Sequence, residues 1–244
     1  MLKIYREDLL LRTCHCDFMG TWRLSAILEA MQEAAGAHAE ALGCGYSQLW
    51  PKGIAWVLTR SRVEMERYPK VGDRVTIKTF PMPNRRMFFP RYFLFEDETG
   101  GRYGTAATVW ALLSLEERRM APPDIVLPFM PDNSDLTPPM PLPGAVEMLE
   151  GEERAFSCAP VYTDLDVNGH VNNTKYADWA CNALGIETMR ESCVGSLLVN
   201  FQAEIRPEQN VTLRLTRAQD RFRLAGYHAD KLHIDLGGVL TPRK

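Results

Sequence analysis

The chain has 244 residues, of which 45% are apolar and 24% charged, with a formal net charge of −3. This composition is typical of a globular protein and excludes a disordered or fibrous chain, and the slight acidic excess argues against a general nucleic-acid binder. No run approaches the roughly 20 apolar residues of a membrane span, and the charged N-terminus lacks the apolar core of a signal peptide, so a cytoplasmic location is expected.

The first half shows one clear order of predicted elements. A strand over about residues 4–16 leads through a polar turn at 17–20 into a long helix, for which Thr21 has the side chain of an N-cap. Apolar residues at helical spacing predict a stripe that faces the core: Leu24, Ile27, Leu28, Met31 and Ala35. Strands are then expected over 54–66, 74–80, 87–95 and 104–115.

A proline-rich segment divides the chain. Residues 121–143 contain eight of the 16 prolines, which prevents a regular helix or sheet ladder. We therefore predict a linker at 126–146 between two units, 1–125 and 147–244. The second half repeats the order of elements, with a strand at 155–163, a turn at 166–169, a helix, and strands at 197–204, 211–216, 221–228 and 232–236.

Two short matches support a duplication. The turn at 17–20 aligns with the turn at 166–169, and ERYP at 66–69 aligns with EIRP at 204–207. One long helix followed by a run of strands, found twice, predicts an α+β protein in which each sheet wraps its own helix.

The densest polar cluster lies in residues 163–179, immediately before the second helix. A solvated loop with Asn172 or Asn173 as helix cap would explain part of it. Asn168 and His170 flank a glycine, and this arrangement at a helix start can aim donors at a bound carbonyl, which suits acyl chemistry. The first half has Met19 and Thr21 at the corresponding places, so one active centre per chain is expected.

The segment DLDVNGHVNNTKYADW at 164–179 resembles the signature of acyl-acyl carrier protein thioesterases, and residues 56–80 and 99–119 resemble the first half of that family. The resemblance implies a tandem double hotdog fold that hydrolyses the thioester of a fatty acyl carrier protein to free fatty acid. It places the catalytic residues at Asp166, Asn168, His170 and Glu204, the last of these in a strand. Glu204 or His170 would be the base that activates water, and Asp166 would hold the loop and the imidazole.

The residue after Glu204 departs from the family. Plant members commonly have a cysteine there, whereas this chain has Ile205, so a cysteine nucleophile at that position is excluded. Cys181 and Cys193 are the nearest thiols along the chain and are better explained as packing residues. No glycine-rich phosphate loop or metal-spaced cluster appears, so neither cofactor nor metal is implied.

A basic segment and an aromatic set suggest how the substrate binds. Between residues 60 and 91 there are nine basic and three acidic residues, which is either a solvated strand face or a docking surface for the acidic acyl carrier protein. The docking candidates are Arg60, Arg62, Arg67, Arg85, Arg86 and Arg91. The resemblance places an acyl tunnel in the first unit, with ordinary core packing as the alternative. The tunnel candidates are Trp22, Met31, Trp56, Phe88, Phe89 and Trp110.

Other functions stay open on the same scaffold. They include an acyl-CoA thioesterase, a hydroxyacyl dehydratase, and a sensor that binds acyl thioesters without cleaving them. A sensor would not need the four polar residues together. A homodimer is also compatible with the sequence. The remaining histidines, His15, His38, His228 and His233, lack polar neighbours in the sequence and are set aside as structural or surface residues.

Overall fold

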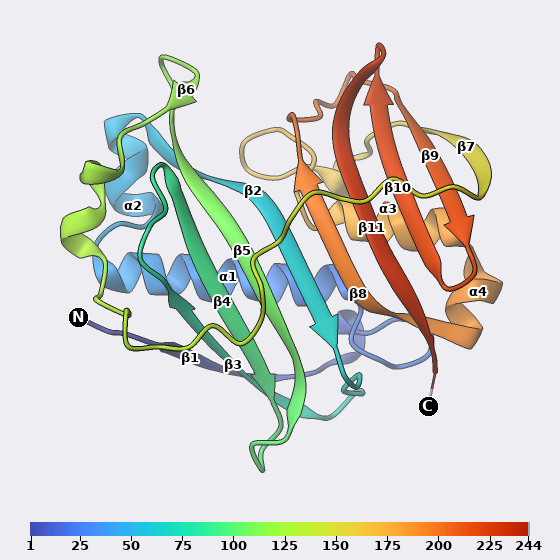
Figure 1. The fold of residues 1–244 in the computed structure, drawn as a ribbon, viewed down its shortest axis with the longest axis horizontal. Helices are drawn as coiled ribbons and strands as arrows, with labels where there is room; N and C mark the ends of the chain where they lie inside the picture. The colour runs from blue at the N-terminus through green and yellow to red at the C-terminus, as the bar shows by residue number, and fades with distance from the viewer. Residues whose placement is uncertain (244) are drawn as a thin grey trace. The chain divides into compact units, whose positions relative to one another are not determined.

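The computed structural model describes residues 1–243, and an antiparallel sheet occupies most of the first half (Figure 1). Its strands are β1 (Tyr5–Leu10), β2 (Ile54–Met65), β3 (Arg74–Pro81), β4 (Phe88–Glu96) and β5 (Arg102–Ser114), with the short β6 (Arg119–Met120) beside β5. Their order in the sheet is β1-β3-β4-β5-β2. These strands are close to the predicted ones, except that β1 ends early in a 3-10 turn at Thr13–His15.

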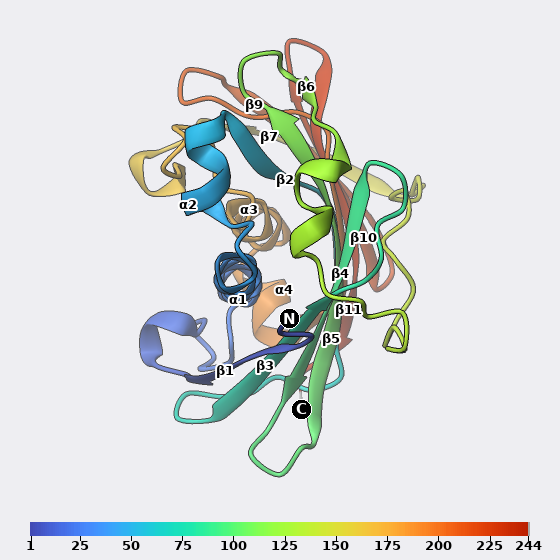
Figure 2. The same cartoon turned by 90° about the vertical axis from the view of Figure 1, so that its left-hand side faces the viewer.

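The long helix α1 (Leu24–Leu42) packs beside this sheet, and Figure 2 shows it nearly end-on next to β3, β4 and β5. All five residues of the predicted apolar stripe are buried, so that prediction is confirmed. The helix is capped by Gly43, whose φ of +85° lies in the left-handed region that favours glycine. The predicted cap is wrong, because Arg23 takes the N-cap position and the hydroxyl of Thr21 instead donates to the carboxylate of Asp17.

The proline-rich segment forms two 3-10 turns, Pro123–Ile125 and Leu127–Phe129, and its chain is fixed along the first sheet. Val126 and Met140 are buried in separate apolar clusters. The amide of Asn133 donates to the carbonyl oxygens of Lys3 and Pro81, at 3.0 and 2.7 Å. Residues up to Pro143 therefore belong to the first compact unit, which comprises Met1–Arg23 and Ile27–Pro143.

The second unit contains residues 24–26 and the chain from Gly144 onward. Its elements are β7 (Glu152–Cys158), α3 (Lys175–Leu184), α4 (Ile186–Glu191), β8 (Ser192–Phe201), β9 (Val211–Ala218), β10 (Arg221–His228) and β11 (Lys231–Pro242). The strands are antiparallel in the order β8-β11-β10-β9-β7. Tyr176, Ala177 and Ala180 of α3 are buried, as the periodicity predicted.

The start of α3 differs in detail from the sequence prediction. Thr174 takes the N-cap position. Asn172 lies two residues before it, and its side-chain oxygen accepts hydrogen bonds from the backbone N–H and the hydroxyl of Thr174, at 3.0 and 2.9 Å. None of the helices formed by residues 1–243 combines the length and apolar character that a bilayer crossing requires.

Candidate active site

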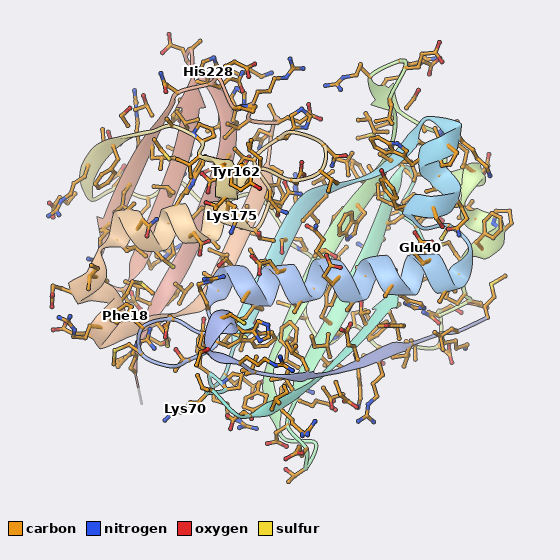
Figure 3. The ribbon with its side chains drawn as sticks, turned by 180° about the vertical axis from the view of Figure 1, so that it is seen from behind. Phe18, Glu40, Lys70, Tyr162, Lys175 and His228 are labelled. Carbon is orange, nitrogen blue, oxygen red and sulfur yellow. The ribbon has the colours of Figure 1, made fainter. Side chains whose placement is uncertain are left out.

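The polar cluster before α3 is a rigid turn built around Asp166. Its carboxylate Oδ1 accepts the backbone N–H groups of Asn168 and His170, at 2.8 and 3.2 Å, and its Oδ2 accepts the side-chain amide of Asn168 at 3.3 Å. Gly169 permits the turn because its φ is +74°. In Figure 3 the loop that contains this turn runs from Tyr162 to Lys175, which begins α3.

The first unit contains the same turn without the polar side chains. There Asp17 accepts the backbone N–H groups of Met19 and Thr21, at 2.9 and 3.1 Å, and Gly20 again has a φ of +74°. The predicted match between residues 17–20 and 166–169 therefore reflects one turn used twice. Asp17 holds this turn although Thr21, not a histidine, stands at the position of His170. The same hydrogen bonds at Asp166 therefore serve first to hold the loop.

The carboxylate of Glu204 is the near partner of the His170 imidazole. Glu204 Oε2 lies 3.4 Å from His170 Nε2, with side-chain exposures of 40% and 22%, so both groups are accessible to a substrate. One backbone hydrogen bond brings their segments together, since the N–H of Val171 donates to the carbonyl oxygen of Ile205 at 2.9 Å. Ile205 itself is completely buried and anchors this segment.

Glu204 was predicted to lie in a strand, and this is wrong. Strand β8 ends at Phe201, and the next two N–H groups, of Gln202 and Ala203, both donate to the carbonyl oxygen of His233 at 2.9 and 3.1 Å. Two donors on one acceptor end the regular ladder, so Glu204 lies in an irregular segment just past the strand. Leaving the ladder frees the side chain from the strict alternation of a strand.

The equivalent segment of the first unit shows that the predicted alignment of residues 66–69 with residues 204–207 is wrong. There the N–H groups of Glu66 and Arg67 share the carbonyl oxygen of Tyr103, and the N–H of Trp22 donates to Pro69. By this pattern of hydrogen bonds Glu204 corresponds to Tyr68, and the alignment of ERYP with EIRP is displaced by two residues. The first unit therefore lacks the acid as well as the asparagine and the histidine.

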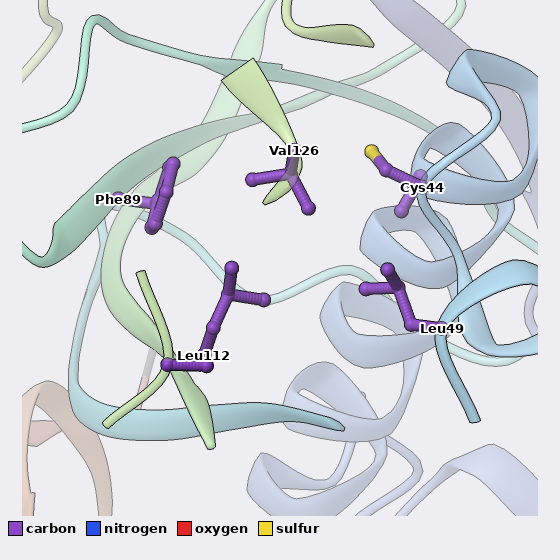
Figure 4. Close-up of a cluster of buried hydrophobic side chains, with 7 residues drawn as sticks. Cys44, Leu49, Phe89, Leu112 and Val126 are labelled. Atoms are coloured by element: carbon purple, nitrogen blue, oxygen red, sulfur yellow. The ribbon is translucent and has the colours of Figure 1, made fainter. Parts of the chain in front are cut away.

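Some of the predicted tunnel residues lie together in the first unit. Trp56 and Trp110 pack against an apolar cluster that contains Phe89, and Figure 4 shows buried members of this cluster, among them Phe89, Leu112 and Val126. The rings of Trp56 and Phe89 meet edge to face, with centroids 5.0 Å apart. Trp22 packs elsewhere, against Phe95. Met31 is buried on α1, and Phe88 is 38% exposed.

The predicted docking arginines fall into three groups. Arg62 and Arg67 are already engaged by the carboxylates of Glu64 and Asp97. Within residues 1–243, the exposed members without a carboxylate partner are Arg60, Arg85 and Arg86.

Arg91 cannot belong to a docking surface, because only 7% of it is exposed. Its guanidinium Nη1 contacts His38 Nδ1 of α1 at 3.1 Å and donates to the hydroxyl of Thr79 on β3 at 3.2 Å. Burial lowers the pKa of Arg91 to about 10. Arg91 lies in a run of five consecutive buried residues of β4, from Phe89 to Phe93, so a predicted surface residue lies in the interior.

Two of the histidines that the sequence set aside, His38 and His233, are buried and have defined partners. The other nitrogen of His38, Nε2, donates to the carbonyl oxygen of Leu2 at 2.9 Å, and burial lowers the pKa of His38 to about 4. His233 contacts the carbonyl oxygen of Glu204 at 2.8 Å through Nδ1. Neither contact leaves a local sequence signal, because each joins residues at least 29 positions apart.

Solved structures resemble this fold over its whole length. An acyl-ACP thioesterase from Bacteroides thetaiotaomicron superposes with a TM-score of 0.86 at 21% identity, covering 98% of both chains. The 12:0-ACP thioesterase from Umbellularia californica gives a TM-score of 0.83 at 20% identity, again covering 98% of each. The chain is therefore an α+β protein with the tandem hotdog fold.

Sequence comparisons identify the family. Residues 3–128 match the acyl-ACP thioesterase N-terminal domain and residues 150–236 match the C-terminal domain, so the chain belongs to the acyl-ACP thioesterase family. A chloroplastic acyl-acyl carrier protein hydrolase of Cuphea viscosissima is 23% identical over 83% of this chain. A chloroplastic palmitoyl-acyl carrier protein thioesterase of Arabidopsis thaliana is 24% identical over 82%. The chain spans about half the length of these curated relatives, 52% in each case.

Proposed function

We propose that this protein hydrolyses the thioester of a fatty acyl carrier protein and releases a free fatty acid. The observation that carries the proposal is the 3.4 Å approach of Glu204 to His170 beside the turn of Asp166, in the unit that alone has these groups. Family membership supports the same reaction. A protein that only bound acyl thioesters would need no exposed carboxylate against an imidazole.

The geometry supports a direct attack by water. Glu204 accepts one proton from a water molecule while the water oxygen bonds to the thioester carbon. The resulting oxyanion is stabilised by the side-chain amide of Asn168, which retains a hydrogen beyond the one it gives to Asp166. The C–S bond then breaks, and His170 protonates the departing sulfur and regains its proton from Glu204.

The first unit supplies candidates for substrate recognition. The apolar cluster of Trp56, Phe89 and Trp110 has the character that an acyl chain requires. Among the docking candidates, Arg60, Arg85 and Arg86 are exposed and have no carboxylate partner within residues 1–243, and they would attract an acidic carrier protein. A cytoplasmic location and a homodimer both stay predictions.

The testing experiment measures free-thiol release from acyl carrier protein and CoA thioesters of several chain lengths. We expect turnover of the carrier-bound substrates and weaker turnover of the CoA series. Efficient hydrolysis of CoA thioesters alone would instead favour an acyl-CoA thioesterase. Binding of either substrate without thiol release would favour a sensor, and loss of water from a hydroxyacyl thioester would identify a dehydratase.

A further inference from the structure

The hairpin between β10 and β11 holds the segment that carries the catalytic glutamate. Its two strands are joined at Ala229 and Asp230, which both have left-handed φ values, of 46° and 64°. A histidine stands on each side of this turn. His228 contacts the carbonyl oxygen of Asn210 and His233 contacts that of Glu204, each through Nδ1 at 2.8 Å.

We propose that His233 is a positioning residue, which fixes the backbone at Glu204 so that the carboxylate stays in reach of His170. This inference rests on the proposed hydrolysis. Because a carbonyl oxygen only accepts hydrogen bonds, Nδ1 of His233 must carry the proton. The residue is 4% exposed, and burial lowers its pKa, so the ring is kept in one neutral tautomer.

His233 acts on the glutamate segment through two different groups. Its carbonyl oxygen accepts the N–H groups of Gln202 and Ala203, which ends the ladder of β8. Its ring donates to a carbonyl oxygen further along the segment, that of Glu204. The following carbonyl, of Ile205, is held by Val171. The backbone on both sides of the catalytic side chain is therefore fixed by hydrogen bonds to His233 and Val171.

The first unit provides an internal comparison. Tyr103 stands where His233 stands, and its carbonyl oxygen accepts the same pair of N–H groups, from Glu66 and Arg67. Its side chain, however, lies under the guanidinium of Arg67, 3.9 Å from the ring centre. The backbone arrangement thus belongs to the scaffold of both units, whereas the histidine, His233, occurs only in the unit that contains Glu204.

The test replaces His233 by leucine and by asparagine and compares kinetics with Tyr103→Leu, the matched change in the first unit. We expect His233→Leu to lower kcat by about 10- to 100-fold, the range that a misplaced catalytic group can cost, with KM within about twofold. His233→Asn keeps an amide donor near Nδ1 and should recover most of this loss. Tyr103→Leu should keep kcat at temperatures below its unfolding midpoint.

A double-mutant cycle separates positioning from general destabilisation. If His233 acts through Glu204, His233→Leu should reduce residual activity by less than about twofold in a Glu204→Ala background. An equal loss in both backgrounds would overturn the proposal, and so would wild-type kcat in His233→Leu. A readout independent of turnover is amide hydrogen exchange at residues 202–206, which should accelerate in His233→Leu and recover in His233→Asn. A wild-type protein that releases no thiol would instead refute the proposed function.

Discussion

The backbone N–H of Val171 donates to the carbonyl oxygen of Ile205, and this bond joins two segments that are 34 residues apart along the chain. Val171 follows His170 directly, and Ile205 follows Glu204. The bond therefore sets the distance between the imidazole and the carboxylate through the backbone, before any side chain is considered. Since Ile205 is completely buried, the anchor is also protected from competing water.

The repeated turn gives a matched pair of variants. Asp166→Ala and Asp17→Ala each remove an acceptor of two backbone N–H groups, so each should lower the free energy of unfolding by about 1–3 kcal/mol. Asp166→Ala should also reduce kcat by about 100-fold, because Asn168 and His170 lose their fixed geometry. Urea unfolding and thiol release measure the two effects. Equal loss of kcat in both variants would show that the turn at Asp166 has no special part in the reaction.

Glu204 and His170 can be distinguished as bases. Glu204→Gln keeps the shape of the side chain and removes its ability to accept a proton, so kcat should fall by about 10²- to 10⁴-fold with little change in KM. Steady-state kinetics on one carrier-bound substrate provide the measurement. If Glu204→Gln turned over normally while His170→Gln did not, the imidazole would be the base.

The exposed arginines of the β3–β4 turn should govern association with the carrier. Arg85→Glu combined with Arg86→Glu is expected to lower kcat/KM for carrier-bound substrates by about tenfold at low salt and less at high salt, because charge steering is screened. Hydrolysis of CoA thioesters should change little. Arg190→Glu is the control, since this arginine lies on α4 in the second unit and pairs with Glu187. Salt-independent loss on both substrates would contradict a docking role.

His38 should make the protein sensitive to acid. Burial, followed by the charge of Arg91, lowers the pKa of His38 from 6.5 to about 4. The unfolded chain therefore binds a proton between these two pH values and the folded protein does not, so stability falls as pH decreases from about 6.5 to 4. The complete effect is on the order of 3 kcal/mol.

The measurement compares unfolding free energies of the wild-type protein and His38→Gln across that pH window. The glutamine oxygen can still accept from Arg91, but the side chain does not titrate. The unfolding free energy of the wild-type protein should therefore decrease relative to that of His38→Gln as the pH falls. Parallel curves would mean that His38 makes no contribution to acid sensitivity.

Local patterns in the sequence were sufficient to predict most elements. The stripe on α1 and the two turns around Gly20 and Gly169 follow from helical spacing and from the residue types that tolerate a left-handed backbone. Both are short-range effects, because the residues involved lie within a few positions of one another. The polar cluster at 163–179 could be located for the same reason.

Two of the wrong predictions have a common physical origin in contacts between distant residues. Arg91 looked like a surface cation, but β4 turns it toward His38 of α1. The sequence aligned Glu66 with Glu204. The hydrogen bonds to Tyr103 and His233 show instead that the residue equivalent to Glu204 is Tyr68, two positions after Glu66. In each case the pairing between strands decides where the residue lies, and the spacing of residues within one strand does not reveal that pairing.

The sequence by itself determined that the chain contains two similar α+β units, that the second alone has the asparagine and histidine of the site, and that its motifs belong to the acyl-ACP thioesterase family. Only the tertiary structure decided that Glu204 lies past the end of its strand, 3.4 Å from His170, and that His233 holds its backbone. The reason is that backbone hydrogen bonds between separate segments fix where a side chain stands, and these bonds exist only once the sheet has formed.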